Sequence, residues 1–276
     1  MKIGIISDLH SDLYKEKGID LLNELNNYFI QNKDIEVLLI AGDITEDINE
    51  TIKFIENLKK KIEIKIYYVP GNHDIWQKQK IEIPTEDIVQ KYAADKNCIT
   101  GKVIQLRDDL VVIGDTGWYD YSFGDNEKFS IEEFIKGSYR ERIWQDKIKI
   151  KFTKMDIEKH KEILNQLERK FEENRNKKVI FITHMINHSF FKVSTENREE
   201  WKFFNGFLGS EDYYKLVKKY KPIVSISGHV HYRKSFVEEE TEFVCSCLGY
   251  HKEFEKSKGE MTLYQNIEES IKVVVV

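Results

Sequence analysis

The chain has 276 residues and a net formal charge of −5, and 41% of its residues are hydrophobic while 33% are charged. This composition is sufficient for a sizeable core and excludes an intrinsically disordered chain. A negative net charge gives no reason to expect nucleic acid as a bulk electrostatic partner.

The three cysteines, Cys98, Cys245 and Cys247, do not form a disulfide framework, and they fit a reducing compartment. Cys245 and Cys247 are two residues apart in an apolar run, so we expect both to be buried on one face of a strand. No apolar run is as long as a membrane span, and residues 2–6 are typical of a core strand rather than a signal peptide. We therefore expect a cytoplasmic protein with no membrane partner.

Buried strands and amphipathic helices alternate along the first part of the chain. Apolar runs predict strands over residues 3–6, 37–41 and 62–69, with helices over residues 19–30 and around residues 52–58 between them. Strand, helix and strand at this spacing predict parallel strands joined by right-handed crossovers. A polar helix is expected over residues 85–95.

The second part of the chain continues the alternation after a predicted hairpin over residues 103–114, with residues 107–109 as its turn. Gly114 and Asp115 are also interpreted as a turn. Further helices are predicted over residues 156–174 and 211–220, and His160 on the first of them is expected to be solvated. Strands are predicted over residues 179–183, 223–227, 235–238, 243–248, 261–264 and 271–276.

Residues 115–155 differ from the rest because they are crowded with aromatic side chains. These are Trp118, Tyr119, Tyr121, Phe123, Phe129, Phe134, Tyr139 and Trp144. Ser130 and Glu133 form a capping-box pattern that predicts the start of a helix. The aromatic residues either cover an apolar edge of the sheet or form a cap that selects the substrate. With no repeat or linker, we predict a single domain over residues 1–276, with residues 115–155 as a cap insertion.

Five predicted strands end on side chains that bind metals. In chain order these are Asp8 and His10, Asp43, Asn72 and His73, His184, and His229 and His231. Because the carboxyl ends of strands in α/β sheets form the ligand-binding edge, a single site is expected to gather them. Val69 is followed by Pro70 and Gly71, which end their strand sharply and expose the polar residues after it.

The donor types indicate divalent ions. Imidazole nitrogens with carboxylate and amide oxygens suit Mn, Fe, Zn or Ni. The donors are too many for one ion, and two ions roughly 3.5–4 Å apart need a bridging anion such as a carboxylate. Such a pair polarises a phosphoryl group and provides a bridging hydroxide at neutral pH, which is the chemistry of phosphoester hydrolysis.

The order Asp-x-His, Gly-Asp, Gly-Asn-His-Asp, His and Gly-His-x-His resembles the calcineurin-like metallophosphoesterase superfamily. All five blocks are present between Asp8 and His231. The resemblance implies an α/β fold, a four-layer α/β/β/α sandwich of two mixed sheets flanked by helices, with the helical aromatic-rich segment as an insertion. It also implies a two-metal site at the strand ends.

The resemblance assigns a role to each residue of the five blocks. It implies that Asp8, His10 and His231 hold the first ion, that Asn72, His184 and His229 hold the second, and that Asp43 bridges them. His73 would bind no metal and would protonate the leaving oxygen or stabilise the developing charge. Asp74 would orient His73 through a ring nitrogen. His188, in the loop after His184, is either a substrate contact or an exposed loop histidine.

One departure from the superfamily pattern narrows the choice of activity. Serine/threonine phosphatases and dinucleoside tetraphosphatases carry Asp-Arg-Gly soon after Gly-Asp, whereas Gly42 and Asp43 are followed here by Ile-Thr-Glu-Asp. The spacing is similar to the compact bacterial phosphodiesterase branch, which includes uncharacterised phosphoesterases with a Gly-Trp-Tyr-Asp segment, here residues 117–120.

The expected function is two-metal hydrolysis of a small soluble phosphodiester or phosphomonoester, with the diester preferred and Mn²⁺ as the first metal to assay. A nuclease is an alternative that would need a basic groove, and a catalytically silent metal-binding scaffold is another. The sequence leaves the native substrate, the native metal and the oligomeric state open.

Overall fold

The computed structural model describes residues 1–77, 83–253 and 261–276. Its first large sheet has the strand order β12-β1-β2-β3. β1, β2 and β3 run parallel to one another, and β12 pairs antiparallel with β1 at one edge. The bounds are β12 (Lys272–Val275), β1 (Lys2–Ile6), β2 (Val37–Ala41) and β3 (Lys65–Val69).

The second large sheet has the order β10-β11-β9-β8-β5-β4. Its four central strands are parallel, and β10 and β4 are antiparallel to their neighbours at the two edges. The bounds are β10 (Arg233–Glu238), β11 (Thr241–Ser246), β9 (Val224–Ser227), β8 (Lys178–Thr183), β5 (Leu110–Asp115) and β4 (Val103–Arg107).

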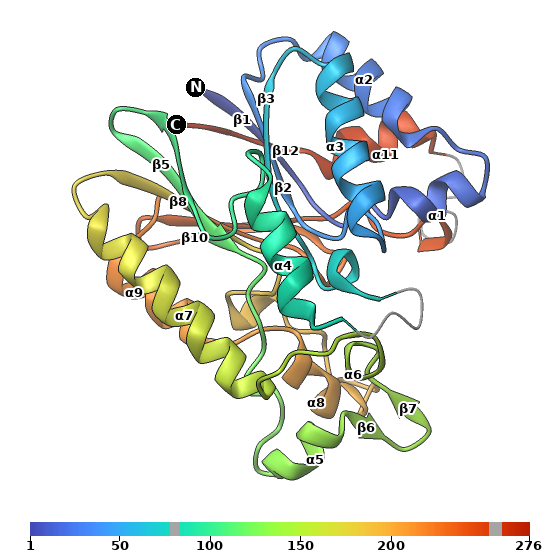
Figure 1. The fold of residues 1–276 in the computed structure, drawn as a ribbon, viewed down its shortest axis with the longest axis vertical. Helices are drawn as coiled ribbons and strands as arrows, with labels where there is room; N and C mark the ends of the chain where they lie inside the picture. The colour runs from blue at the N-terminus through green and yellow to red at the C-terminus, as the bar shows by residue number, and fades with distance from the viewer. Residues whose placement is uncertain (78–82, 254–260) are drawn as a thin grey trace.

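Helices cover the outer faces of both sheets, which gives the predicted four layers (Figure 1). Beside the first sheet lie α1 (Ser11–Glu16), α2 (Leu21–Gln31), α3 (Ile48–Lys61) and α11 (Leu263–Ser270), and beside the second lie α7 (Asp156–Glu173) and α9 (Glu211–Tyr220). Between the sheets, Ile3 and Ile5 of β1 share one apolar cluster with Ile180 and Ile182 of β8. Along each strand, successive side chains thus point alternately toward the other sheet and toward the outer helices.

The helices form where the sequence provides an apolar face and a cap. Leu21, Leu25, Tyr28 and Phe29 of α2 are buried at helical spacing. Asp47 caps α3 by accepting hydrogen bonds from Asn49 N and Glu50 N. The last turn of α3 contains three lysines, whose positive charges interact favourably with the negative end of the helix dipole.

Smaller elements lie together beyond one end of the sheets (Figure 1). They are α5 (Ile131–Lys136), the β6 (Ser138–Tyr139) and β7 (Arg142–Ile143) hairpin, α6 (Asp146–Lys149) and α8 (Trp201–Phe204). The capping box of Ser130 and Glu133 is present at the start of α5. Phe134 lies at the centre of this region, with its ring stacked on Tyr121 and Phe203 at centroid distances of 5.3 and 4.9 Å.

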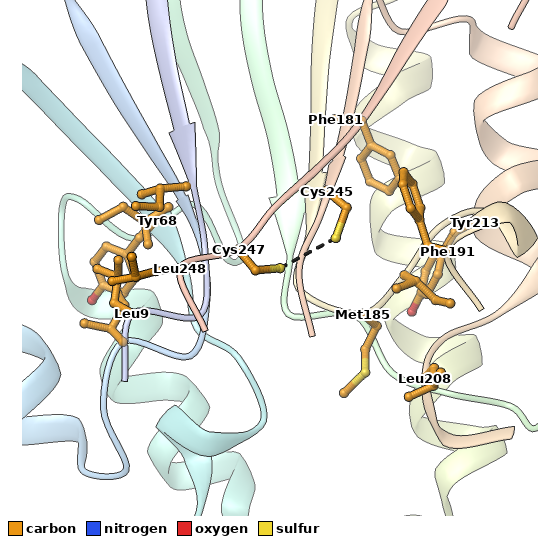
Figure 2. Close-up of a cluster of buried hydrophobic side chains, with 14 of the residues drawn as sticks. Leu9, Tyr68, Phe181, Met185, Phe191, Leu208, Tyr213, Cys245, Cys247 and Leu248 are labelled. Carbon is orange, nitrogen blue, oxygen red and sulfur yellow. Dashed lines mark hydrogen bonds between the residues drawn. The ribbon is translucent and has the colours of Figure 1, made fainter. Parts of the chain in front are cut away.

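The two sheets meet near Cys245 and Cys247. Both thiols are buried, with their sulfur atoms 3.6 Å apart, and Cys247 forms a bridge with Ser7 after β1. Figure 2 shows them between a group around Tyr68 and Leu248 on one side and a group around Phe181 and Tyr213 on the other. The predicted burial of these cysteines on one side of a strand is confirmed.

Some predicted elements were wrong. Residues 261–264, predicted as a strand, instead span the start of α11 at Leu263, because Thr262 and Gln265 form a capping box that starts a helix. β3 begins at Lys65 rather than at residue 62, because α3 continues to Lys61. Asp115 is the last residue of β5 and pairs with Thr183, so it is not in a turn.

The remaining short elements connect these layers. They are α4 (Thr85–Ala94) and the 3₁₀ turns η1 (His73–Ile75), η2 (Ser189–Phe191) and η3 (Asn205–Phe207). No helix in residues 1–77, 83–253 and 261–276 has the length and apolar character needed to span a membrane.

Candidate metal centre

The predicted site residues follow the carboxyl ends of parallel strands in both sheets. Asp8 and His10 follow β1, Asp43 follows β2, Asn72 and His73 follow β3, His184 follows β8, and His229 and His231 follow β9. The structure brings all of them to one edge, as the position of strand ends in an α/β sandwich requires.

Five of these residues have left-handed backbones, with φ of 54° at Asp8, 41° at His10, 54° at Asp43, 72° at His229 and 54° at His231. Each such residue costs of order 1–3 kcal/mol and persists only where the surroundings impose it. Aspartate and histidine tolerate this region better than bulky or β-branched residues. The sharp backbone turns after β1, β2 and β9 therefore direct these side chains into one small volume.

Two glycines permit the close approach of the β2 and β3 loops. A Cβ atom on Gly71 would lie 2.0 Å from Asp43 Oδ1, and one on Gly42 would lie 2.6 Å from Gly71 N. Gly42 also has a φ of +85°, which side chains rarely adopt. The backbone of one loop thus touches the carboxylate of the other.

The first ligand group contains Asp8, His10 and His231. His231 Nε2 lies 3.4 Å from Asp8 Oδ1 and 3.2 Å from His10 Nε2. The other ring nitrogen of His231 is 2.7 Å from Glu253 Oε2, so it carries a proton and donates to this carboxylate. The nitrogen that faces Asp8 and His10 is therefore the one available to bind a cation.

The second ligand group contains Asn72, His184 and His229. His184 Nε2 lies 2.9 Å from Asn72 Oδ1 and 3.2 Å from His229 Nδ1. His184 Nδ1 is 2.8 Å from the carbonyl oxygen of Ala41, which accepts a hydrogen bond only, so this nitrogen is the donor. Nε2 of His184 therefore faces two further electron-pair donors.

Asp43 lies between the two groups. Its Oδ1 is 3.4 Å from His184 Nε2, and its Oδ2 is 4.0 Å from His10 Nε2. Each carboxylate oxygen thus faces a different group, which is the arrangement expected of a bridging carboxylate.

The buried carboxylates determine which histidines of the two groups carry a proton. Burial would lower the pKa of every ring, but Asp43 and Asp8 raise the pKa of His184 to about 9, and hydrogen bonds to Asp8 and Glu253 raise the pKa of His231 to about 10. Burial lowers the pKa of His10 and of His229 to about 3. Each group thus holds one protonated and one neutral imidazole.

These donors fit divalent ions. In each group the carboxylate and imidazole ligand atoms lie within 4.8 Å of one another, so a divalent ion could bind between them. A divalent ion in each group would replace the proton that His184 or His231 holds. Two such ions would be held by the residues of both groups, with Asp43 shared.

His73 lies beside the centre and has the properties of a proton donor. Its Nε2 is 3.9 Å from Asp43 Oδ2 and its Nδ1 is 3.6 Å from Glu46 Oε1. Burial would lower the pKa of His73, but the negative charges of Asp43 and Glu46 raise it. Trp76 stacks on the ring at a centroid distance of 3.5 Å and restricts its rotation.

The prediction that Asp74 orients the His73 ring was wrong. The Asp74 carboxylate accepts hydrogen bonds from Gly71 N at 2.7 Å, Thr45 N at 3.0 Å and Thr51 Oγ1 at 2.8 Å. Gly71 belongs to the loop after β3, whereas Thr45 and Thr51 come after β2. Asp74 therefore connects the loop after β3 to the segment after β2. Burial and the charge of Asp43 raise the pKa of Asp74 to about 6.

A cavity of 690 Å³ opens over this edge. Asp43, Asn72, His73, His229 and His231 form its floor. Its walls are residues 141–146 of the predicted cap, the loop residues Val193, Arg198, Trp201, Phe204 and Leu208, and a third group comprising Trp76, Val230, Tyr232, Tyr250 and Glu253. The polar floor lies beside a wall that contains both aromatic side chains, such as Trp144, and charged ones, such as Arg142 and Arg198. This lining suits an organic molecule with a phosphoryl group.

Comparisons with known proteins agree with this geometry. The family model described as calcineurin-like phosphoesterase matches residues 1–233. The chain belongs to the calcineurin-like phosphoesterase family. Members of this family typically bind two divalent metal ions, and the two ligand groups of this phosphoesterase are candidates to hold them.

Individual relatives extend the comparison over nearly the whole chain. An uncharacterised protein of Acanthamoeba polyphaga mimivirus is 27% identical over 266 residues, covering 90% of this chain and 91% of that protein. The crystal structure of phosphopantetheinyl hydrolase from Mycobacterium tuberculosis is similar with a TM-score of 0.76 at 16% identity, covering 99% of this chain and 95% of that one. A dimetal phosphatase from Danio rerio has a TM-score of 0.53 at 9% identity, covering 89% of this chain and 86% of that one.

His188 does not join the ligand groups of this phosphoesterase. Its Nε2 is 3.4 Å from Glu238 Oε2, and its ring packs against Phe236 and Phe243 at centroid distances of 4.9 and 4.8 Å. Within the described part of the chain, the cavity lining does not include it. A substrate contact by His188 has no support from this position.

The prediction that His160 is solvated was wrong. The side chain is buried, with Nδ1 3.0 Å from the carbonyl oxygen of Trp118 and Nε2 3.3 Å from Ser210 Oγ. The charged neighbours in sequence suggested an exposed face, but α7 turns this position toward the loop after β5.

Sequence reasoning missed several residues near the centre. Glu46, Glu253 and Tyr250 each contact a predicted ligand or His73, with the Tyr250 ring 4.4 Å from that of His10. Asp146 accepts a hydrogen bond from Asn72 Nδ2 at 2.8 Å. Glu46, three residues after Asp43, was visible in the sequence as a nearby carboxylate, whereas the others come from distant segments that no local pattern connects to the site.

Proposed function

We propose that this phosphoesterase hydrolyses a small phosphodiester with two divalent ions, using Asp8, His10, Asp43, Asn72, His184, His229 and His231 as ligands and His73 as the proton donor. The observation that carries the proposal is the position of Asp43, whose two oxygens face separate histidine groups on the floor of a cavity. Divalent ions bound there would polarise the phosphoryl oxygens and activate a water molecule.

The residues of the chain account for the other requirements of the reaction. His73 reaches the cavity beside Asp43, and Asp43 and Glu46 favour its imidazolium form. It would donate the Nε2 proton to the leaving oxygen as the ester bond breaks. Trp76 on one side of the ring would keep this proton directed at the substrate.

The lining of the cavity supports an organic ester, and we propose that this ester is a diester rather than a monoester. Trp144, Trp201 and Phe204 provide an apolar wall next to the ligands, and an organic substituent on the phosphoryl group could be buried there. We propose that residues 115–155 act as a cap through this wall. Phosphopantetheinyl compounds are suitable test substrates, because a hydrolase named for them shares the fold.

Mn²⁺ is our first choice of ion, because the oxygen and imidazole donors suit it. We also propose action in the cytoplasm, since Cys98, Cys245 and Cys247 are all free thiols.

Hydrolysis of bis(p-nitrophenyl) phosphate beside p-nitrophenyl phosphate tests the function. The protein would be stripped of metal, supplied with Mn²⁺, and compared with His73→Ala. Mn²⁺-dependent turnover of the diester that falls at least about a hundredfold in the variant would support the proposal. A preference for the monoester would show that the substrate is a phosphomonoester rather than a phosphodiester. Bound metal without turnover of any phosphoester would favour a metal-binding scaffold.

A further inference from the structure

We infer that Asp146 is a positioning residue that fixes the side-chain amide of Asn72 and thereby retains one of the two ions. The inference rests on the proposed metal site. Asp146 is the first residue of α6, in the predicted cap, and its side chain is 2% exposed. The mechanism proposed above does not use it.

Three donors surround this buried carboxylate. Its Oδ1 accepts from Asn72 Nδ2 at 2.8 Å and from Trp76 Nε1 at 2.7 Å, and its Oδ2 accepts from Trp144 Nε1 at 2.8 Å. Hydrogen bonds to an ionised acceptor are stronger than neutral ones, and they satisfy a buried charge that would otherwise be costly.

The pairing determines which way the amide of Asn72 points. An ionised carboxylate only accepts hydrogen bonds, so it selects the NH₂ end of the amide. The Asn72 oxygen is then directed to the other side, where it lies 2.9 Å from His184 Nε2. A flipped amide would place two oxygens against each other at Asp146 and would remove the oxygen ligand from the second group. Asp146 therefore selects the amide orientation that binds a cation.

The same carboxylate links the cap to the reacting groups. Trp144 lines the cavity, and Trp76 stacks on His73, so both indoles that donate to Asp146 also touch the site. By contrast, the first ligand group is supported by Glu253 on His231, which comes from another segment. Loss of Asp146 should therefore weaken the ion held by Asn72, His184 and His229 and leave the other ion bound.

Calorimetric titration of the metal-free protein with Mn²⁺ tests this selectivity without relying on turnover. In Asp146→Asn, we expect one of the two ions to bind 10–100-fold more weakly and the other to bind as in the wild type. Asp156→Asn is the matched control, because Asp156 also accepts from a tryptophan, Trp118 Nε1 at 2.8 Å, but touches no predicted ligand. The control should bind both ions normally.

A double-mutant cycle separates positioning from general stability. If Asp146 acts through Asn72, then Asp146→Asn should cause no further loss of affinity in an Asn72→Ala background. A further loss there, equal weakening of both ions, or unchanged binding in Asp146→Asn would overturn the inference.

Two further outcomes are informative, namely misfolding of Asp146→Asn and binding of fewer than two Mn²⁺ ions by the wild-type protein. Should Asp146→Asn fail to fold, Trp144→Phe removes one donor from the carboxylate, and the same ion should then bind at least about threefold more weakly. Unchanged binding in Trp144→Phe would count against the inference. Wild-type protein that binds fewer than two Mn²⁺ ions would refute the proposed two-metal site itself, and with it the role of Asp146.

Discussion

At the scale of single residues, the site depends on a few carboxylates that determine which histidines carry charge. Asp8 and Asp43 are buried, yet the histidines beside them keep the pKa of both carboxyl groups well below the usual range. The carboxylates therefore remain ionised inside the protein, and the rings facing them compete with a metal ion for the same position.

Asp43→Asn should remove the charge shared by the two ligand groups. We expect the purified variant to retain neither ion, because Asn presents a neutral oxygen and an NH₂ group where two cations need an anion between them. Metal analysis of protein reconstituted with Mn²⁺ measures this directly, with the exposed Glu63→Gln as a control. Two ions per chain in Asp43→Asn would contradict the bridging assignment.

Glu46→Gln should change the pH dependence of hydrolysis. The Glu46 carboxylate raises the pKa of His73, so its removal lowers that pKa. Since His73 must be protonated to act as an acid, the alkaline limb of the kcat/KM profile should move to lower pH. Glu50→Gln, which only breaks an exposed pair with Lys15, should leave the profile in place. An unshifted alkaline limb in Glu46→Gln would show that Glu46 does not tune the acid.

At the scale of elements, the predicted cap is held by aromatic packing rather than by a sheet. Phe134 of α5 is fully buried, and its ring contacts Tyr121, Phe129 and Phe203. α8, which carries Phe203, belongs to a different part of the chain, so the predicted cap packs against a second segment.

Phe134→Ala should loosen these elements selectively. Truncation of a buried phenylalanine costs about 3–5 kcal/mol, and here the loss falls on contacts between α5, α8 and their loops. Hydrogen exchange should accelerate over residues 129–144 and 201–207 more than in β1, β2 or β8. Phe171→Ala, in α7 against β8, provides the comparison, because its buried ring packs on Phe181 of the second sheet. Uniform acceleration in both variants would mean that the cap unfolds only with the whole domain.

At the scale of the whole molecule, the candidate metal centre joins the two sheets. Asp8 and Asp43 follow strands of the first sheet, whereas His184 and His229 follow strands of the second. An ion held by both sets of ligands would connect the two sheets at the carboxyl ends of their parallel strands. The chain termini lie at the opposite end, where Met1 N donates to the Val276 carbonyl oxygen (Figure 1).

Metal binding should therefore stabilise the entire fold. With free Mn²⁺ at a hundred times its Kd, one site contributes about 2.7 kcal/mol, which corresponds to a rise in Tm of roughly 5–10 °C for a chain of this size. Thermal unfolding with EDTA and with Mn²⁺ measures the difference, and Asp43→Asn should lose most of it. Equal Tm values under both conditions would show that the ions do not hold the sheets together.

From the sequence alone we predicted the strands that carry the site residues, the order of their polar endings and the family, because these depend on local patterns. Apolar runs that end on Asp-x-His, Gly-Asp, Gly-Asn-His-Asp and Gly-His-x-His identify a strand and a ligand at the same point of the chain. Both ends of β2 (Val37–Ala41) were predicted correctly, because this apolar run ends at Gly42 and Asp43. The gathering of these endings at one edge followed from the geometry of parallel strands.

The groups that support the ligands could be identified only from the folded structure. Asp74 and Glu46 both lie near His73, and the distance between atoms, not the spacing in sequence, shows that Glu46 contacts the ring while Asp74 binds backbone amides. Asp146 is 74 residues from Asn72, and hydrogen bonds over such separations leave no periodic signal. The burial of His160 could not be predicted for the same reason, because the charged residues around it on the helix do not reveal that a distant loop covers it.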